Sequence, residues 1–109
     1  MIDSHQGSNP GTRIFRITGP LTLSNVFGFQ NALRNVDVPA LAILDLTSVP
    51  YMDSAGMGAV VNYYTHCQRK GTRMIVAGVN SRARELFVLT KVHTIIPMTA
   101  SIAEAEALS

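Results

Sequence analysis

The stretch Met52–Gly58 (MDSAGMG) constrains this chain most, because a buried strand ends just before it and a helix begins within it. Residues 41–46 (LAILDL) form a short apolar run, which is typical of a strand inside a sheet. The residues that follow repeat at the spacing of one helix face: Met57, Val60, Val61 and Tyr64. Asp53 and Ser54 therefore lie at a helix N-terminus, where unpaired backbone N–H groups favour a capping oxygen or a phosphate.

The same change from strand pattern to helix pattern repeats along the chain. Strand patterns cover residues 13–18, 41–47, 73–79 and 94–98, and helix patterns begin near residues 24, 54, 81 and 101. Such alternation with short connections predicts a mainly parallel sheet covered by helices. The predicted fold class is α/β, with a small sheet of four to five strands, mixed at its edge, and about four helices. Pro97 lacks the N–H that a sheet ladder needs, so we expect it at a strand end or a sheet edge.

The helix ends also carry specific expectations. Thr22 or Ser24 is expected to cap the first helix, whose inner face includes Val36. Asn80 or Ser81 is expected to cap the third helix. The pattern Ser101-Ile102-Ala103-Glu104 predicts a capping box on a last helix that turns Leu108 inward.

Length and composition indicate one globular domain. The 109 residues are 47% hydrophobic, enough for one core, and we expect a loose arm over residues 1–12 followed by a domain over 13–109. Cys67 is the single cysteine, so neither a disulfide nor a cysteine metal site is predicted, and no cofactor is predicted either. The nine basic residues are dispersed, which disfavours direct binding of nucleic acid. With neither an apolar run of about 20 residues nor a signal peptide, we expect a cytoplasmic protein that does not insert in a membrane.

Hydrolase chemistry at Ser54 does not fit the pattern around it. A nucleophile elbow needs glycine two residues before the serine, and Met52 stands there. His66 lies about three helical turns beyond Ser54, out of hydrogen-bond reach on an ideal helix. We therefore predict a protein that is not an enzyme and has no catalytic residue.

A phosphoacceptor aspartate like that of the receiver domains of two-component signalling is also disfavoured. Asp45 follows an apolar run, but that chemistry needs Mg²⁺ held by further carboxylates near the end of the first strand. Residues 17–20 (ITGP) contain no acid there, and Lys91 is followed by valine instead of proline. Asp45 is interpreted as a strand-end or capping residue.

The two glycines after Ser54 are interpreted as structural. Gly56 and Gly58 allow the first turn of the helix to pack closely against the sheet, and they leave Ser54 open to a large partner. Asp53 is either an N-cap that accepts from the N–H of Ala55 or Gly56, or a residue that orients Ser54 or contacts a partner. Met52 and Met57 are either core residues or soft contacts on a docking face.

These residues together resemble the signature of STAS domains, the sulphate-transporter and anti-sigma-factor-antagonist family. The likeness covers residues 45–49 (DLTSV) and 52–58 (MDSAGMG), and extends through 71–76 (GTRMIV) and 84–87 (RELF). The chain looks like the free-standing bacterial antagonist type. The resemblance implies a STAS-like fold over about residues 13–108.

In that family, the serine matched by Ser54 is phosphorylated by a kinase that is itself an anti-sigma factor. The unphosphorylated antagonist binds the kinase and frees a sigma factor, phosphorylation ends the binding, and a phosphatase resets the switch. The expected docking surface joins the 19–22 loop to the serine motif: Leu21, Thr22, Met52, Asp53, Ser54, Met57 and Gly58. Other family members are never phosphorylated and serve as scaffold subunits of signalling or lipid-transport complexes, which is the alternative function.

Two departures from the family pattern matter. The family commonly begins with an extra apolar strand, for which residues 1–11 offer only Ile2. Ala55 stands where the family often has Ser or Thr, so Ser54 carries the only hydroxyl of the motif.

Overall fold

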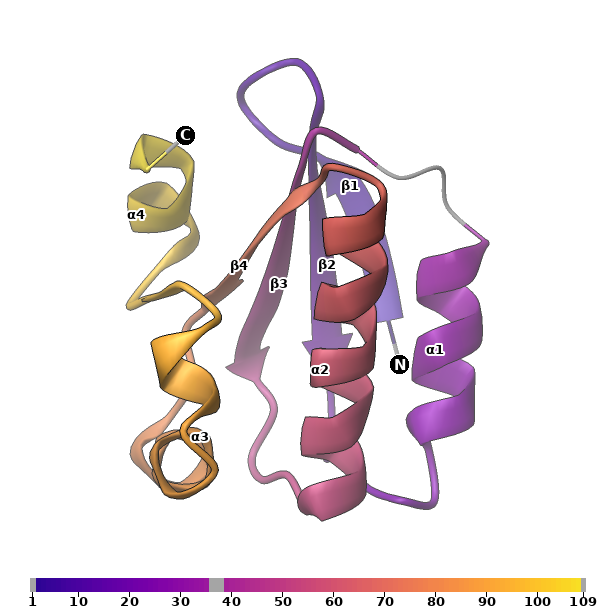
Figure 1. The fold of residues 1–109 in the computed structure, drawn as a ribbon, viewed down its shortest axis with the longest axis vertical. Coiled ribbons are helices and arrows are strands. Elements are labelled where there is room, and N and C mark those ends of the chain that lie inside the picture. The colour runs from indigo at the N-terminus through magenta and orange to yellow at the C-terminus, as the bar shows by residue number, and fades with distance from the viewer. Residues whose placement is uncertain (1, 36–38, 109) are drawn as a thin grey trace.

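Five strands form one sheet in the order β1-β2-β3-β4-β5 in the computed structural model, which describes residues 2–35 and 39–108 (Figure 1). Their bounds are Ile2–Gln6, Thr12–Thr18, Leu41–Ser48, Arg73–Ala77 and Met98–Thr99. β1 pairs with β2 antiparallel, and every other pair is parallel. The predicted α/β class, with a mainly parallel sheet mixed at its edge, is confirmed.

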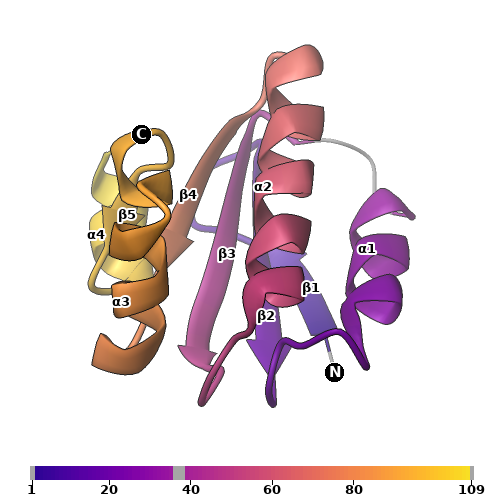
Figure 2. The same ribbon diagram turned by 60° about the horizontal axis from the view of Figure 1, so that its bottom comes forward.

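Helices cover both faces of the sheet. α1 (Val26–Arg34) and α2 (Ser54–Arg69) lie side by side on one face, and α3 (Ser81–Leu89) lies on the other side of α2 (Figure 2). α4 (Ile102–Ala107) packs on the opposite face, where Ala105 meets Ile14, Ile43 and Ile75. β3 is buried on both sides, which explains the unbroken apolar run of its sequence. Within the described residues, no helix has the length and apolar character that a membrane span requires.

Residues 2–6 form the edge strand β1, which corrects the prediction of a loose arm over residues 1–12. Only Ile2 of this strand packs against the main core. The strand is held by backbone pairing with β2, from Ile2 opposite Ile17 to Gln6 opposite Arg13, and by Arg13 donating to the Ser4 hydroxyl at 2.9 Å. Because backbone pairing at a solvent-facing edge needs no apolar pattern, the polar sequence IDSHQ carries no clear strand signal.

The strand expected over residues 94–98 is wrong in its bounds. A short 3₁₀ helix, η1 (Val92–Thr94), follows α3, and β5 contains only Met98 and Thr99. The change of direction begins at Lys91, whose φ of 61° is left-handed. Pro97 directly precedes β5 at the sheet edge, as its missing N–H predicts, and its carbonyl accepts from the Val76 N–H at 2.9 Å.

Several helix details also differ from expectation. Asn25, rather than Thr22 or Ser24, precedes α1, and its side chain does not cap the helix. The inner face of α2 includes Tyr63 and Cys67, whereas Val61 and Tyr64 are half-buried. Burial raises the pKa of both Tyr63 and Cys67, so their neutral forms sit in the core. Leu108 is exposed instead of turned inward, and the expected core position Val36 lies outside the described residues.

Candidate functional site

Ser54 is the first residue of α2 and is exposed. β3 ends at Ser48, and a short loop leads from it to the helix, so the serine lies at the sheet end where β2 and β3 finish (Figure 1). Within residues 2–35 and 39–108, its hydroxyl makes no hydrogen bond. An unpaired hydroxyl beside the N–H groups of a helix N-terminus is open to modification by phosphate.

Asp53 is the N-cap of α2, as one of its two sequence interpretations predicts. Its Oδ1 accepts from the backbone N–H of Gly56 at 2.9 Å. Its Oδ2 accepts from the N–H of Leu23 at 3.1 Å, a bond that the sequence did not indicate. One carboxylate therefore fixes the start of α2 and also ties it to the loop that enters α1.

The hydrogen bonds from Gly56 and then Leu23 hold the pKa of Asp53 below its ordinary value of 3.8. Because the unfolded chain takes up this proton at a higher pH than the folded chain, the charged carboxylate stabilises the fold above about pH 4. That contribution is lost as the pH falls through the lowered pKa.

We predict that Asp53→Asn reduces the free energy of unfolding at pH 6, and that the difference from the wild type shrinks below about pH 4. Asparagine keeps a capping oxygen but lacks the charge that interacts with the helix N-terminus. Urea denaturation of both proteins at pH 6, 4 and 3 measures this difference. A difference that stays constant across this range would show that the carboxylate charge is not the stabilising feature.

Gly56 lies where two backbone segments touch. Leu21 pairs with Met52 in a parallel bridge, the Leu21 N–H donates to Tyr51 O at 3.1 Å, and the Asp53 N–H donates to Leu21 O at 3.3 Å. A Cβ on Gly56 would lie 2.1 Å from the Leu21 carbonyl oxygen. The expected close packing is therefore confirmed at Gly56, although against the 19–22 loop instead of the sheet.

Gly58 has a different environment from Gly56. A Cβ added there would meet no atom within 4 Å, and the residue is exposed. Close packing is thus the wrong interpretation for Gly58. Its place in the second turn of α2 leaves open space near Ser54, as the other interpretation predicts.

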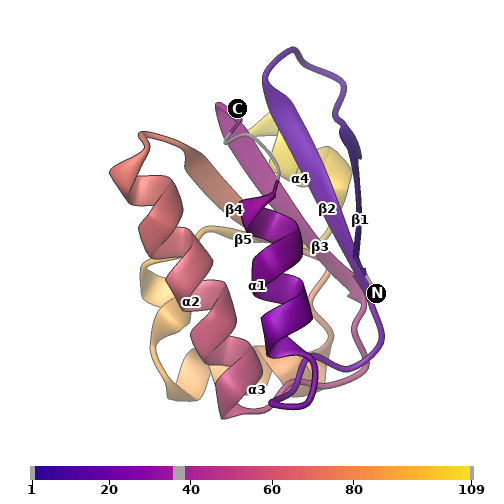
Figure 3. The same cartoon turned by 90° about the vertical axis from the view of Figure 1, so that its right-hand side faces the viewer.

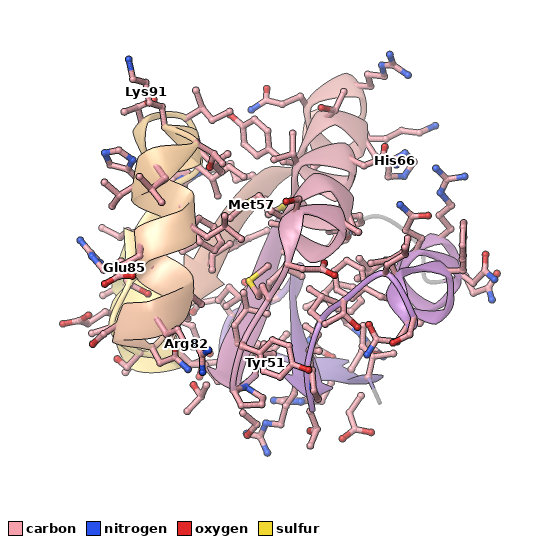
Figure 4. All side chains as sticks on the ribbon, turned by 90° about the horizontal axis from the view of Figure 1, so that it is seen from below. Tyr51, Met57, His66, Arg82, Glu85 and Lys91 are labelled. Carbon is pink, nitrogen blue, oxygen red and sulfur yellow. The ribbon has the colours of Figure 1, made fainter. Side chains whose placement is uncertain are left out.

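The expected docking residues divide into exposed and buried groups. Ser54 and Gly58 are exposed, and three others are half-buried: Thr22, Met52 and Asp53. Leu21 is 1% exposed and Met57 is 4% exposed, and Met57 points into the interior below α2 (Figure 4). Their side chains cannot meet a partner in this structure, so that part of the prediction is corrected and both belong to the core.

Two exposed apolar side chains were missed, one on the loop that bonds to Asp53 and one at the start of α1. Leu23 is 66% exposed on the loop bonded to Asp53, and Phe27 is 70% exposed in the first turn of α1. Large apolar groups exposed together at one end of a protein are typical of interaction surfaces. The sequence could have indicated the exposure of Phe27, because this residue falls outside the apolar helix face formed by Val26, Phe29 and Leu33.

Asn80 also holds the loop before Ser54 from the other side, through contacts that sequence reasoning missed. Its Oδ1 caps α3 by accepting from the Ala83 N–H at 2.8 Å, as expected from the sequence. Its Nδ2 donates to the carbonyl oxygens of Val49 at 3.2 Å and Pro50 at 3.0 Å. Next to it, the Arg82 guanidinium lies 5.9 Å from the centre of the Tyr51 ring (Figure 4).

We predict that Asn80→Asp destabilises the protein by about 1–2 kcal/mol, because it keeps the capping oxygen and replaces the donor to two carbonyls with an acceptor. Asn80→Ala removes the cap as well and should cost about 1 kcal/mol more than the loss of the donor bonds alone. Urea denaturation provides both values. Wild-type stability in Asn80→Asp would show that the bonds to Val49 and Pro50 contribute nothing.

Asp45, the carboxylate compared with a receiver aspartate, lies within β3 on the face covered by α4. It is buried, pairs with the Arg16 Nε at 3.3 Å, and accepts from the Thr47 N–H at 3.0 Å and from the Thr47 hydroxyl. The described part of the chain contains no group of three His, Cys, Asp or Glu side chains that could hold a metal ion. The contacts of Asp45 are those of a structural residue.

Comparison with known proteins agrees with this architecture. The STAS domain family model matches residues 7–105. A curated Listeria monocytogenes protein named "Anti-sigma-B factor antagonist" is 34% identical over 53 residues, which are 49% of this chain and 46% of that relative. The chain thus matches just under half the length of that relative.

Solved structures extend the likeness in fold over nearly the whole chain. The crystal structure of an anti-sigma factor antagonist from Mycobacterium paratuberculosis has a TM-score of 0.85 at 17% identity, covering 99% of this chain and 93% of that one. A sulfate transporter family protein from Wolinella succinogenes has a TM-score of 0.84 at 22% identity, covering 94% and 88%. At these identities, the structures establish a shared fold.

Proposed function

This chain belongs to the STAS domain family, and on that basis we propose that it is an anti-sigma-factor antagonist controlled by phosphorylation of Ser54. In its unphosphorylated form it binds an anti-sigma-factor kinase, and the phosphorylated form releases that kinase until a phosphatase removes the phosphate. The protein itself acts as a binding partner and not as an enzyme. The observation that carries the proposal is the exposed Ser54 hydroxyl at the N-terminus of α2. The name of the Listeria monocytogenes relative supports it.

The chemistry around Ser54 suits a switch in affinity that leaves the fold intact. A phosphoserine adds about −1.5 to −2 charges at neutral pH. In the free protein, the N-terminus of α2 and the surrounding water tolerate this charge. In a docked complex, the phosphate would lose water and lie next to the Asp53 carboxylate, which is itself bonded to the loop that carries the exposed Leu23. Phosphorylation therefore disfavours the complex more than the free protein.

The first experiment identifies the kinase and the residue it modifies. Immobilised Ser54→Ala protein is used to recover a kinase from a lysate of the source organism, and that kinase is then incubated with ATP and each variant. We expect one phosphate on the wild type, mapped to Ser54 by mass spectrometry, and none on Ser54→Ala. Phosphorylation of Ser54→Ala to the wild-type extent would place the site elsewhere.

Ser81 provides a matched control for this assay. It is an exposed serine at the first position of α3, directly after a residue whose side chain caps the helix, as Ser54 is in α2. Ser81→Ala should be phosphorylated like the wild type. If Ser81→Ala is not phosphorylated, the kinase does not recognise Ser54 only by the residues that surround Ser54.

A scaffold subunit that is never phosphorylated is the second candidate function. The shared fold with a protein named for the sulfate transporter family supports it, because the same fold then occurs outside the proteins named as anti-sigma factor antagonists. A scaffold would capture the same partners whether residue 54 is serine, alanine or aspartate. The switch requires capture by the alanine variant and loss of capture by the aspartate variant.

A further inference from the structure

Strand β1 forms one edge of the sheet, and β2 is its only strand neighbour among the described residues (Figure 3). The two strands pair without interruption from Ile2 to Gln6, so β1 contains no bulge. Its sequence, IDSHQ, contains neither proline nor lysine. Bulges, prolines and lysines are common devices that keep a free sheet edge from pairing with another chain. The β1 edge has none of them.

The hydrogen-bond pattern determines which backbone groups of β1 face β2. The Gly7 N–H donates to the Thr12 carbonyl oxygen at 2.8 Å, and these two residues continue the register of the β1–β2 pair. Hydrogen-bonded pairs alternate with non-hydrogen-bonded pairs along an antiparallel ladder. Counting back from Gly7 by twos, His5 and Asp3 are therefore the residues of β1 whose backbone bonds β2.

The backbone N–H and C=O groups of Ile2, Ser4 and Gln6 point away from β2, because these residues occupy the non-hydrogen-bonded positions. Within residues 2–35 and 39–108, no backbone group of another segment bonds them. Outward N–H and C=O groups along an uninterrupted edge are a template for a further strand.

We propose that β1 pairs antiparallel with β1 of a second copy of this chain, so that one sheet runs through both protomers. The register that pairs all five residues of the strand centres on Ser4. In this register Ser4 lies opposite the partner's Ser4, and Ile2 lies opposite the partner's Gln6. The residues with outward backbone groups then all fall in hydrogen-bonded pairs, as an antiparallel ladder requires.

Charge complementarity selects a second copy as the occupant of this edge. Asp3 lies opposite the partner's His5 in the same register, at a non-hydrogen-bonded position where cross-strand side chains approach closely. An imidazole donates to a carboxylate, and its protonated form adds an ion pair. Symmetry makes this contact twice. Arg16, which lies opposite Asp3 in the same protomer, bonds the buried Asp45 through its Nε at 3.3 Å.

The same two residues also exclude neighbouring registers. A slip of two residues in one direction would place Asp3 opposite the partner's Asp3, and a slip in the other direction would place His5 opposite the partner's His5. Like groups that lie directly opposite each other destabilise strand pairing. The register centred on Ser4 is therefore favoured both by its length and by its charges.

The proposed dimer does not depend on the phosphorylation switch. Among the described residues, the backbone of β1 bonds β2 and not the loop before Ser54. Each protomer would keep its own exposed Ser54. The Ser54→Asp protein should therefore self-associate like the wild type, so failure of the dimer is distinguishable from failure of the proposed switch.

Sedimentation equilibrium of the full chain measures the association. We expect a reversible dimer with a dissociation constant between about 10 μM and 1 mM, because five residues from each protomer make a small interface. In NMR spectra at rising concentration, the amide signals of Ser4 and Gln6 should shift more than those of Asp3 and His5, which already bond β2. A chain that stays monomeric at millimolar concentration would overturn the proposal, as would a dimer without these shifts.

Ser4→Pro tests the hydrogen bonds across the edge. It removes an N–H that points outward and leaves the bonds to β2 in place, so the dimer should weaken at least about tenfold while the fold remains. Ser4→Ala is the matched control, because it loses only the hydroxyl that accepts from Arg13 and should dimerise like the wild type. Circular dichroism melting establishes that each variant is folded. Wild-type association of a folded Ser4→Pro protein would place the interface elsewhere.

His5→Glu and His5→Lys test the partner and the register, and they provide the test if Ser4→Pro does not fold. His5 is exposed, so neither substitution should alter the monomer. Glutamate would face the partner's Asp3 and should weaken the dimer about tenfold over the two contacts, whereas lysine should bind at least as tightly as the wild type. Equal affinities of the two variants would overturn the pairing of Asp3 with His5.

Discussion

Ser54→Asp is expected to bind the partner kinase about 100-fold more weakly than Ser54→Ala, because it places a fixed negative charge beside Asp53 in the docked interface. Truncation to alanine removes the hydroxyl without adding charge, so this variant should remain in the binding form. Aspartate carries less charge than a phosphate, so the phosphorylated wild type should bind more weakly still. Isothermal titration calorimetry with the purified kinase measures all three affinities.

The matched control for this prediction is Ser81→Asp. It introduces the same charge at the same position of another exposed helix start, and its affinity should stay within about twofold of the wild type. The Ser54→Asp protein should also retain its fold, because aspartate in the first turn suits the helix dipole. Equal affinity of Ser54→Asp and Ser54→Ala, with both proteins folded, contradicts the switch and favours the scaffold function.

Gly56→Ala is expected to destabilise the protein by about 2–4 kcal/mol, the largest effect on stability that we predict. The new Cβ would lie 2.1 Å from the carbonyl oxygen of Leu21 and 2.9 Å from its carbonyl carbon. Both atoms belong to backbone, so the 19–22 loop has to move away from α2. That movement weakens the hydrogen bonds that Leu21 makes with Tyr51 and Asp53.

Gly58→Ala is the matched control two residues further along the same helix. Nothing lies within 4 Å of its added Cβ, so alanine should stabilise the helix by about 0.5–1 kcal/mol through its better propensity. Urea denaturation of the two variants gives both free energies of unfolding. If Gly56→Ala is as stable as the wild type, the close contact with Leu21 is not a feature of the folded protein in solution.

The sequence by itself determined the features that depend on neighbours a few residues away. The alternation of apolar periodicities gave the α/β class, because strands and helices bury side chains at different spacings. The caps by Asp53, Asn80 and Ser101 were predictable, because each side chain bonds a backbone N–H three residues further on. The position of Ser54 at the start of α2 follows from the same local rule, and the family resemblance assigned it a role.

Only the tertiary structure decided which segments meet around Ser54. Asp53 bonds the N–H of Leu23, 30 residues away, and Asn80 bonds the carbonyl of Val49, 31 residues away. Neither bond has a local signal, because a capping side chain looks the same in sequence whether or not its other atoms find a distant partner. The burial of Leu21 and the need for glycine at position 56 have the same origin, since both depend on where the 19–22 loop packs.

Strand β1 shows the same limit at the edge of the sheet. Its polar residues are held by backbone pairing with β2, and backbone groups are the same in every sequence except at proline. Local periodicity therefore determined the elements and the place of Ser54, whereas contacts between distant segments determined the sheet edge and the hydrogen bonds that hold the serine loop.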